Sequence, residues 1–187
     1  MDWNDEKLLE ILKKRGVAVM PTDTIYGIIG RAEDVSVVNR IYDLKKRTPK
    51  KPCIILIGDI RELKKFSITL SEEQESFMQG LSLHQDRPTS IILDCFDEKL
   101  AYLHRGTNSL AFRLPAPEAL RDLLLTVGPL IAPSANPEGL PPAENDSQAK
   151  KYFGDSVDLY INGGFLSGKA SKLIKLHKDG TVTILRE

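Results

Sequence analysis

The chain has 187 residues, of which 41% are hydrophobic and 28% are charged, and its 26 basic and 26 acidic residues give a formal net charge of zero. This length fits one well-buried domain, and this composition argues against long disordered segments. No apolar run in the sequence reaches the length of a membrane span. The balanced charge removes bulk electrostatics as an argument for nucleic-acid binding. Because the acidic, polar N-terminus is unlike a secretory leader, we expect a cytoplasmic protein.

Helix and strand patterns alternate through the first half of the chain. Apolar residues at helical spacing precede Gly16, and a short apolar run follows it. Ser36 is the expected N-cap of the next helix, and Ser71 followed by Gln74 has the form of a capping box. These patterns predict helices over residues 8–12, 36–44 and 71–78, and strands over residues 17–20 and 53–57.

The second half continues the alternation. A helix with Pro117 near its start is expected, and the turn at residues 178–180 favours a hairpin at the end of the chain. The predicted helices cover residues 117–125 and 148–153, and the predicted strands cover residues 89–93, 110–113, 130–132, 159–161, 172–177 and 181–186. We therefore expect one α/β domain over residues 1–187, with a twisted mixed parallel and antiparallel sheet flanked by helices.

Cysteine and histidine give no sign of a metal site. Cys53 and Cys95 lie in apolar runs without a CxxC spacing, which favours buried core residues. The three histidines are scattered singly, so no metal ligand is predicted. Neither cysteine lies in a polar, cation-rich setting, and no serine has an evident histidine and acid partner. These observations disfavour covalent catalysis.

Residues 21–27 (PTDTIYG) follow directly on the first predicted strand. The segment is dense in hydroxyl, carboxyl and phenol groups, at the kind of position where α/β proteins bind ligands. The alternative is an ordinary turn, in which Pro21 ends the strand and Asp23 or Thr24 caps local backbone groups. For Asp23 itself, a structural cap is the favoured interpretation.

A second polar cluster, residues 45–52 (KKRTPKKP), carries five cationic side chains between a predicted helix and a predicted strand. Cations near a helix C-terminus complement the helix dipole, which is a sufficient reason for them. The apolar strand that follows places some of them at a sheet end, where phosphates could bind instead.

A third cluster, residues 132–139 (APSANPEG), also follows a short apolar strand. Ser134 and Asn136 offer a hydroxyl and an amide for phosphate or nucleotide groups, although a turn alone accounts for the composition. The chain has no GxxxxGK[ST] or GxGxxG motif. A site of cations, hydroxyls and an amide suits phosphoryl or nucleotidyl transfer, where positioning and charge neutralisation supply most of the rate.

Taken in order, these clusters resemble the YrdC-like family of threonylcarbamoyl-AMP synthases. The likeness consists of residues 21–27, Lys45-x-Arg47 with Lys51-Pro52, Arg113 within residues 112–115 (FRLP), and Ser134-x-Asn136, and it extends over residues 16–164. The resemblance implies the YrdC-like fold. It also implies an enzyme, a nucleotidyltransferase that makes threonylcarbamoyl-AMP and pyrophosphate from L-threonine, bicarbonate and ATP. The product would pass to a separate transferase that modifies adenosine 37 of tRNA.

The resemblance also implies roles for individual residues. The expected catalytic residues are Lys45 and Arg47. The expected ATP contacts are Lys45, Arg47, Lys51, Ser134, Asn136 and Arg186, and the expected threonine contacts are Thr24, Tyr26, Arg113 and Ser171. We expect Mg²⁺ to arrive with ATP, because the sequence has no carboxylate cluster that would hold it alone.

Two other functions stay open at this point. The first is an RNA-binding module, with residues 45–51 and Arg105 forming a basic groove, whose RNA affinity would fall steeply with salt. The second is a paralogue that adenylates another carbamoylated substrate, as in hydrogenase-maturation proteins with a similar domain. The acylphosphatase and zinc-finger parts of those proteins have no counterpart in these 187 residues.

Overall fold

The computed structural model describes residues 3–83 and 87–187. The strands in these ranges are β1 (Ala18–Pro21), β2 (Tyr26–Arg31), β3 (Ile54–Leu56), β4 (Thr89–Asp94), β5 (Ser109–Arg113), β6 (Leu130–Ile131), β7 (Leu159–Tyr160), β8 (Lys172–Leu176) and β9 (Val182–Arg186). The α-helices are α1 (Glu6–Lys13), α2 (Val35–Lys45), α3 (Glu72–Leu83), α4 (Ala101–His104), α5 (Glu118–Val127) and α6 (Asp146–Phe153). Shorter 3₁₀ segments cover Ile60–Phe66, Glu98–Leu100 and Gly154–Ser156.

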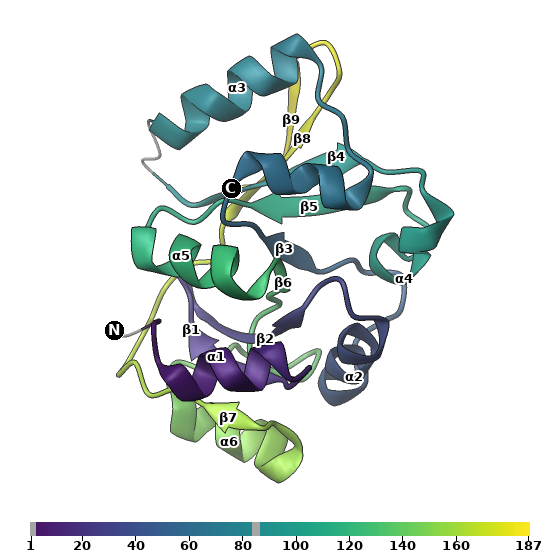
Figure 1. Ribbon diagram of the computed structural model, residues 1–187. Helices are drawn as coiled ribbons and strands as arrows, with labels where there is room; N and C mark the ends of the chain where they lie inside the picture. Colours follow the sequence, from purple (N-terminus) through teal and green to yellow (C-terminus); the bar gives the residue numbers. More distant parts are fainter. Residues whose placement is uncertain (1–2, 84–86) are drawn as a thin grey trace.

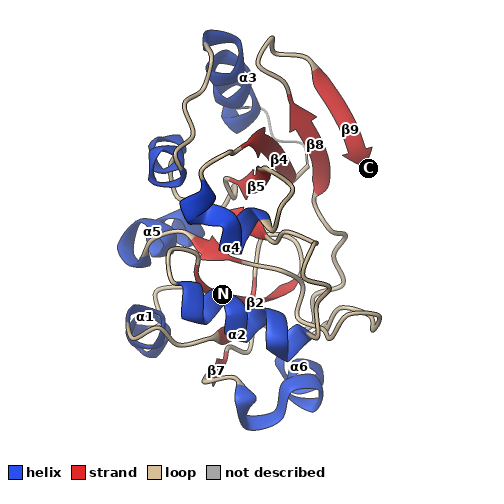
Figure 2. Cartoon of the chain, turned by 90° about the vertical axis from the view of Figure 1, so that its right-hand side faces the viewer, coloured by secondary structure: helices blue, strands red, loops and turns tan. Residues whose placement is uncertain are grey.

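The described strands form one sheet in the order β7-β1-β2-β6-β3-β5-β4-β8-β9 (Figure 1). The pairs β1/β7, β3/β5 and β4/β8 are parallel, and the other neighbours are antiparallel. Helices α1 and α5 lie side by side in Figure 1, and in Figure 2 they lie to the left of the strands with long loops to the right. The predicted fold class, a mixed sheet flanked by helices, is confirmed.

Local signals at two helix starts can be checked directly. At α3 the capping box is confirmed, because the Gln74 N–H donates to Ser71 Oγ and the Ser71 N–H donates to Gln74 Oε1, both at 3.1 Å. At α2 the N-cap is Asp34, not Ser36. Asp34 Oδ1 accepts from the N–H groups of Ser36 and Val37 at 3.0 and 3.2 Å, so the carboxylate takes the capping position two residues earlier.

Strand β2 was not predicted, and it shortens the polar loop after β1. Pro21 pairs with Tyr26 in an antiparallel ladder, so residues 22–25 alone make the turn. The sequence of β2, YGIIGR, contains two glycines that interrupt the apolar pattern, although five of its six residues are buried. The 3₁₀ segment Ile60–Phe66 and helix α4 were also not predicted.

The core consists of two clusters of buried side chains, one on each side of β1. Val17 and Val19 belong to the larger cluster, whereas Ala18 and Met20 belong to the smaller one, as the alternation of side chains along a strand requires. The smaller cluster is closed by leucines of α1 and α5. Cys53 and Cys95 are both buried and free, as predicted. No helix within the described ranges is long and apolar enough to cross a membrane.

Candidate active site

A cavity of about 520 Å³ opens over the middle strands of the sheet. Strand β5 explains its position, because alternate side chains of a strand point to opposite faces. Leu110 and Phe112 belong to the larger core cluster, whereas Ser109, Ala111 and Arg113 line the cavity. Strands β3, β4 and β8 add apolar lining side chains, namely Ile54, Ile92 and Leu173. The volume is within the usual range for small-molecule sites.

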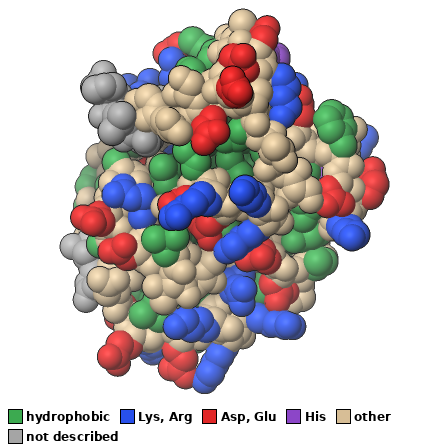
Figure 3. Space-filling view, turned by 45° about the horizontal axis from the view of Figure 1, so that its top comes forward, with side chains coloured by type: hydrophobic (Ala, Val, Ile, Leu, Met, Phe, Trp, Pro, Cys, Tyr) green, Lys and Arg blue, Asp and Glu red, His purple; other side chains and the backbone are tan. Residues whose placement is uncertain are grey.

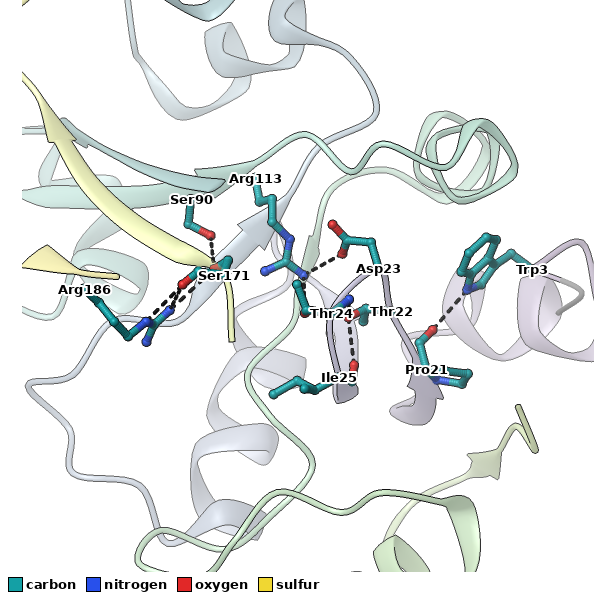
Figure 4. Close-up of polar contacts among 10 residues, drawn as sticks. All are labelled: Trp3, Pro21, Thr22, Asp23, Thr24, Ile25, Ser90, Arg113, Ser171 and Arg186. Atoms are coloured by element: carbon teal, nitrogen blue, oxygen red, sulfur yellow. Dashed lines mark hydrogen bonds and ion pairs between the residues drawn. The ribbon is translucent and has the colours of Figure 1, made fainter. Parts of the chain in front are cut away.

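One end of the cavity, called here the arginine end, is formed by Arg113, Asp23, Thr24, Ser171 and Arg186. Arg113 Nη2 donates to Asp23 Oδ1 at 2.9 Å and to Thr24 Oγ1 at 3.3 Å (Figure 4). Both side chains of this ion pair are 3% exposed. Arg113 Nε and Asp23 Oδ2 are buried and find no hydrogen-bond partner within the described part of the chain. Buried polar atoms without a partner, beside a cavity, favour the binding of a polar ligand.

A second guanidinium lies at the arginine end. Arg186 Nε and Nη2 donate to the Ser171 carbonyl oxygen at 3.0 and 2.8 Å, and Ser171 Oγ lies 2.8 Å from Ser90 Oγ (Figure 4). Burial and the nearby Arg113 and Arg87 guanidiniums lower the pKa of Arg186. Two lining guanidiniums and the single carboxylate of Asp23 leave this end positive, which suits a ligand carboxylate.

The turn at residues 22–25 is packed against the segment before β8. A Cβ on Gly168 would lie 1.9 Å from the Thr24 carbonyl oxygen, so glycine is needed for the two backbones to approach this closely. Within the turn, Thr22 Oγ1 donates to the Ile25 carbonyl oxygen at 2.8 Å (Figure 4). The main chain at Thr24 is therefore held by the hydrogen bond within the turn and by close packing against Gly168.

The other end of the cavity, called here the lysine end, is lined by Arg47, Lys50 and Lys51. Strands β3 and β5 are parallel and Ile54 is paired with Ala111. Residues that precede Ile54 therefore lie towards the start of β5, away from Arg113 at its end.

The backbone of the lysine end is held by side chains. Arg47 Nε donates to the Lys51 carbonyl oxygen at 2.9 Å, and Arg47 Nη2 donates to the Pro52 carbonyl oxygen at 3.0 Å. Tyr42 donates its hydroxyl to the same Lys51 carbonyl at 2.9 Å. The loop between α2 and β3 thus has a fixed shape in which the cations are presented.

Glu138 contacts this loop through its carboxylate. It accepts from Lys51 Nζ, from the Thr48 N–H, and from Thr48 Oγ1 at 2.9 Å. The hydrogen bonds from Lys51 and Thr48 lower the pKa of Glu138 to about 2. The carboxylate is therefore ionised at any physiological pH.

Lys45 is 1% exposed, unlike the other cations of residues 45–52. Its Nζ donates to the carbonyl oxygens of Ser134 and Asn136, both at 2.5 Å, and its own carbonyl accepts from the Glu138 N–H at 2.7 Å. Burial, with the nearby Arg47 cation, lowers the pKa of Lys45 to about 8. Lys45 therefore ties the end of α2 to the loop after β6.

The structure brings together most of the residues that the sequence singled out. The predicted site residues that line the cavity are Thr24, Arg47, Lys51, Arg113, Ser134, Ser171 and Arg186. Lys45, Asn136 and Tyr26 are not among the described residues of its lining. Asn136 Nδ2 donates to the carbonyls of Pro137 and Leu140 at 3.0 and 2.6 Å. Tyr26 donates its hydroxyl to the Gly164 carbonyl at 2.8 Å and accepts from the Gly163 N–H at 2.9 Å.

Sequence reasoning missed three contributors to the site. Asp23, interpreted as a local cap, is the ion-pair partner of Arg113. Ser109 and Thr107 line the cavity beside the lysine end. For Ser109 a signal existed, because alternation along β5 places it on the same face as Arg113. No comparable signal linked Asp23 to Arg113, which are 90 residues apart in sequence.

The alternative of a basic RNA-binding groove gains little from the geometry. Lys45 is buried, and Arg105 stacks over the Tyr42 ring with its Cζ 4.0 Å from the ring centroid. Lys and Arg side chains on the face in Figure 3 are interspersed with Asp and Glu. The described residues also contain no group of three or more His, Cys, Asp or Glu side chains placed to hold a metal ion.

Comparisons with known proteins identify the family. The family model Sua5_yciO_yrdC, described as "Telomere recombination", matches residues 10–187. Proteins named threonylcarbamoyl-AMP synthase from Hahella chejuensis and Stutzerimonas stutzeri are 30% and 26% identical; the matches cover 99% and 97% of this chain and 98% and 96% of those proteins. A solved double-alanine variant of P. abyssi Sua5 has a TM-score of 0.85 at 25% identity; the match covers 100% of this chain but 54% of that one. The chain belongs to the Sua5/YciO/YrdC family.

Proposed function

We propose that this chain is a threonylcarbamoyl-AMP synthase, which makes threonylcarbamoyl-AMP and pyrophosphate from L-threonine, bicarbonate and ATP. The names of the relatives matched over nearly their full length support this activity. The observation that carries the proposal is the form of the cavity: an arginine end with a buried ion pair and a lysine end with an exposed one, joined by an apolar floor. An amino acid and a nucleoside triphosphate both carry anionic groups, and both substrates must bind in one cavity for the reaction to occur.

The chemistry has two steps. The threonine amine forms a bond to the carbon of carbon dioxide or bicarbonate, with loss of a proton or of water, and yields a carbamate. A carbamate oxygen then attacks the α-phosphorus of ATP, and the bond from that phosphorus to the bridging oxygen breaks to release pyrophosphate. Negative charge grows on the leaving pyrophosphate, so fixed cations near it stabilise the transition state.

The arginine end is the proposed site for threonine. Arg113 would pair with the substrate carboxylate, while the hydroxyls of Thr24 and Ser171 contact its polar groups. The resemblance assigns Arg186 to ATP. Arg186 lines the same end of the cavity and donates to the Ser171 carbonyl. We therefore propose that Arg186 contacts the α-phosphate next to the bound threonylcarbamoyl group.

The lysine end is the proposed site for the triphosphate. Arg47 and Lys51 would neutralise the phosphates, with the Ser134 hydroxyl as a further contact. Lys45, Asn136 and Tyr26 are proposed as positioning residues, because they are not among the described residues that line the cavity and their polar atoms bind neighbouring backbone groups. Mg²⁺ would enter bound to ATP. The adenylate would pass to a tRNA-modifying transferase in the cytoplasm.

The test is to incubate the purified protein with ATP, L-threonine, bicarbonate and Mg²⁺, and to measure pyrophosphate and the adenylate by mass spectrometry. Arg47→Ala should lower the rate by about 100-fold or more, as the loss of one fixed transition-state donor does. Arg61→Ala is the matched control, because Arg61 is 84% exposed and pairs with Asp59 instead of lining this cavity. Release of pyrophosphate without threonine, or no release, would contradict the proposal.

A further inference from the structure

At the lysine end, a carboxylate of the chain itself occupies a ready-made position for an anion. Three donors converge on Glu138, namely the Thr48 N–H, the Thr48 hydroxyl at 2.9 Å and the Lys51 ammonium. A backbone N–H, a hydroxyl and a cation are the groups that proteins use to hold phosphate oxygens. The carboxylate of Glu138 is thus held by a set of donors that also suits a phosphate oxygen.

The backbone that carries the three donors is held in place without Glu138. The Lys51 N–H donates to the Thr48 carbonyl oxygen at 3.1 Å and closes a turn between the two residues. The Lys51 carbonyl accepts from Tyr42 and from Arg47, both at 2.9 Å. We call the Thr48 N–H, the Thr48 hydroxyl and the Lys51 ammonium the anion seat. The backbone of this seat does not depend on the Glu138 side chain.

Glu138 can leave the seat by side-chain rotation alone. Its main chain is fixed by the hydrogen bond from its N–H to the Lys45 carbonyl oxygen at 2.7 Å. The side chains of Lys51 and Glu138 are 58% and 26% exposed, and ion pairs with such exposure are weak because water and salt screen them. A multiply charged phosphate is a stronger ligand for the same donors.

We propose that the anion seat binds a phosphate group of the nucleotide or of pyrophosphate, and that Glu138 is an internal competitor displaced when the phosphate binds. The identity of the phosphate ligand rests on the proposed function, whereas the seat and its competitor rest on the contacts above. An internal competitor lowers the measured affinity by the fraction of molecules whose seat is free. If Glu138 fills the seat about 90% of the time, its removal raises the affinity about tenfold.

The experiment measures binding of inorganic pyrophosphate by calorimetry, at fixed ionic strength and without Mg²⁺ or threonine. Glu138→Gln and Glu138→Ala should each bind pyrophosphate about tenfold more tightly than the wild type. Glu10→Gln is the matched control, because it also removes one carboxylate from an ion pair, here between Glu10 on α1 and Lys14 just after that helix. That control should bind as the wild type does. Adding Thr48→Val to Glu138→Gln should reverse part of the gain, which a general change of charge would not do.

Equal or weaker binding by both Glu138 variants would overturn the proposal, as would the same gain in Glu10→Gln. Two variants are used so that one remains informative if the other fails to fold, which thermal unfolding reveals. Pyrophosphate release by the wild type with threonine is measured in parallel. If that release is absent while the Glu138 variants gain affinity, the proposed synthase activity fails and the anion seat stands.

Discussion

Both ends of the cavity pair a cation with a carboxylate, but they differ in burial. Arg113 and Asp23 are each 3% exposed, whereas Lys51 and Glu138 are 58% and 26% exposed. Breaking a buried ion pair costs about 3–5 kcal/mol, while an exposed pair contributes about 0–1 kcal/mol. The difference implies that the Arg113–Asp23 pair is a fixed part of the fold, whereas Lys51 can exchange the carboxylate of Glu138 for a ligand.

The largest effect is expected from Asp23→Ala, which leaves the Arg113 cation buried beside Thr24 without its partner. The free energy of unfolding should fall by about 3–5 kcal/mol, as measured by urea denaturation. The double variant Asp23→Ala/Arg113→Met should recover part of this loss, because no unpaired charge remains. A loss below about 1 kcal/mol in the single variant would show that the arginine end is no more fixed than an exposed pair.

The next effect concerns Lys45, whose pKa is lowered from 10.5 to about 8. Between these two values the unfolded chain keeps a proton that the folded chain has lost, so the free energy of unfolding rises with pH. Relative to Lys45→Met, the wild type should gain up to about 3 kcal/mol between pH 8 and 10.5, since each pKa unit corresponds to about 1.4 kcal/mol. Denaturation at several pH values measures this, and parallel profiles of the two proteins would rule it out.

The smallest effect is expected from Lys51→Met, which breaks the exposed pair. Its free energy of unfolding should differ from that of the wild type by less than about 1 kcal/mol. Its affinity for pyrophosphate should nevertheless fall, because Lys51 supplies the cation of the anion seat. A destabilisation as large as that of Asp23→Ala would remove the contrast between the two ends.

Much of the fold was predictable because its signals are local. The capping box at Ser71 and Gln74, and the apolar runs that became β1, β3 and β5, depend on neighbouring residues in sequence. Strand β2 was missed because it is buried on both faces and contains two glycines, so it has no alternating pattern.

The site was predictable as a set of residues but not in its pairings. Asp23 with Arg113 and Lys51 with Glu138 are separated by 90 and 87 positions, and the sequence pattern does not indicate which charges meet. Lys45 and Arg47 look alike as cations of one cluster. The structure shows that their environments differ: Lys45 is buried against the backbone of the loop after β6, whereas Arg47 lines the cavity.

The most direct test of a two-ended site for threonine and ATP is the exchange of labelled pyrophosphate into ATP, measured with bicarbonate and Mg²⁺ in the presence and absence of L-threonine. Because pyrophosphate can re-form ATP only from an adenylate, we predict exchange that depends on threonine. Exchange at the same rate without threonine, or no exchange in its presence, would contradict the account.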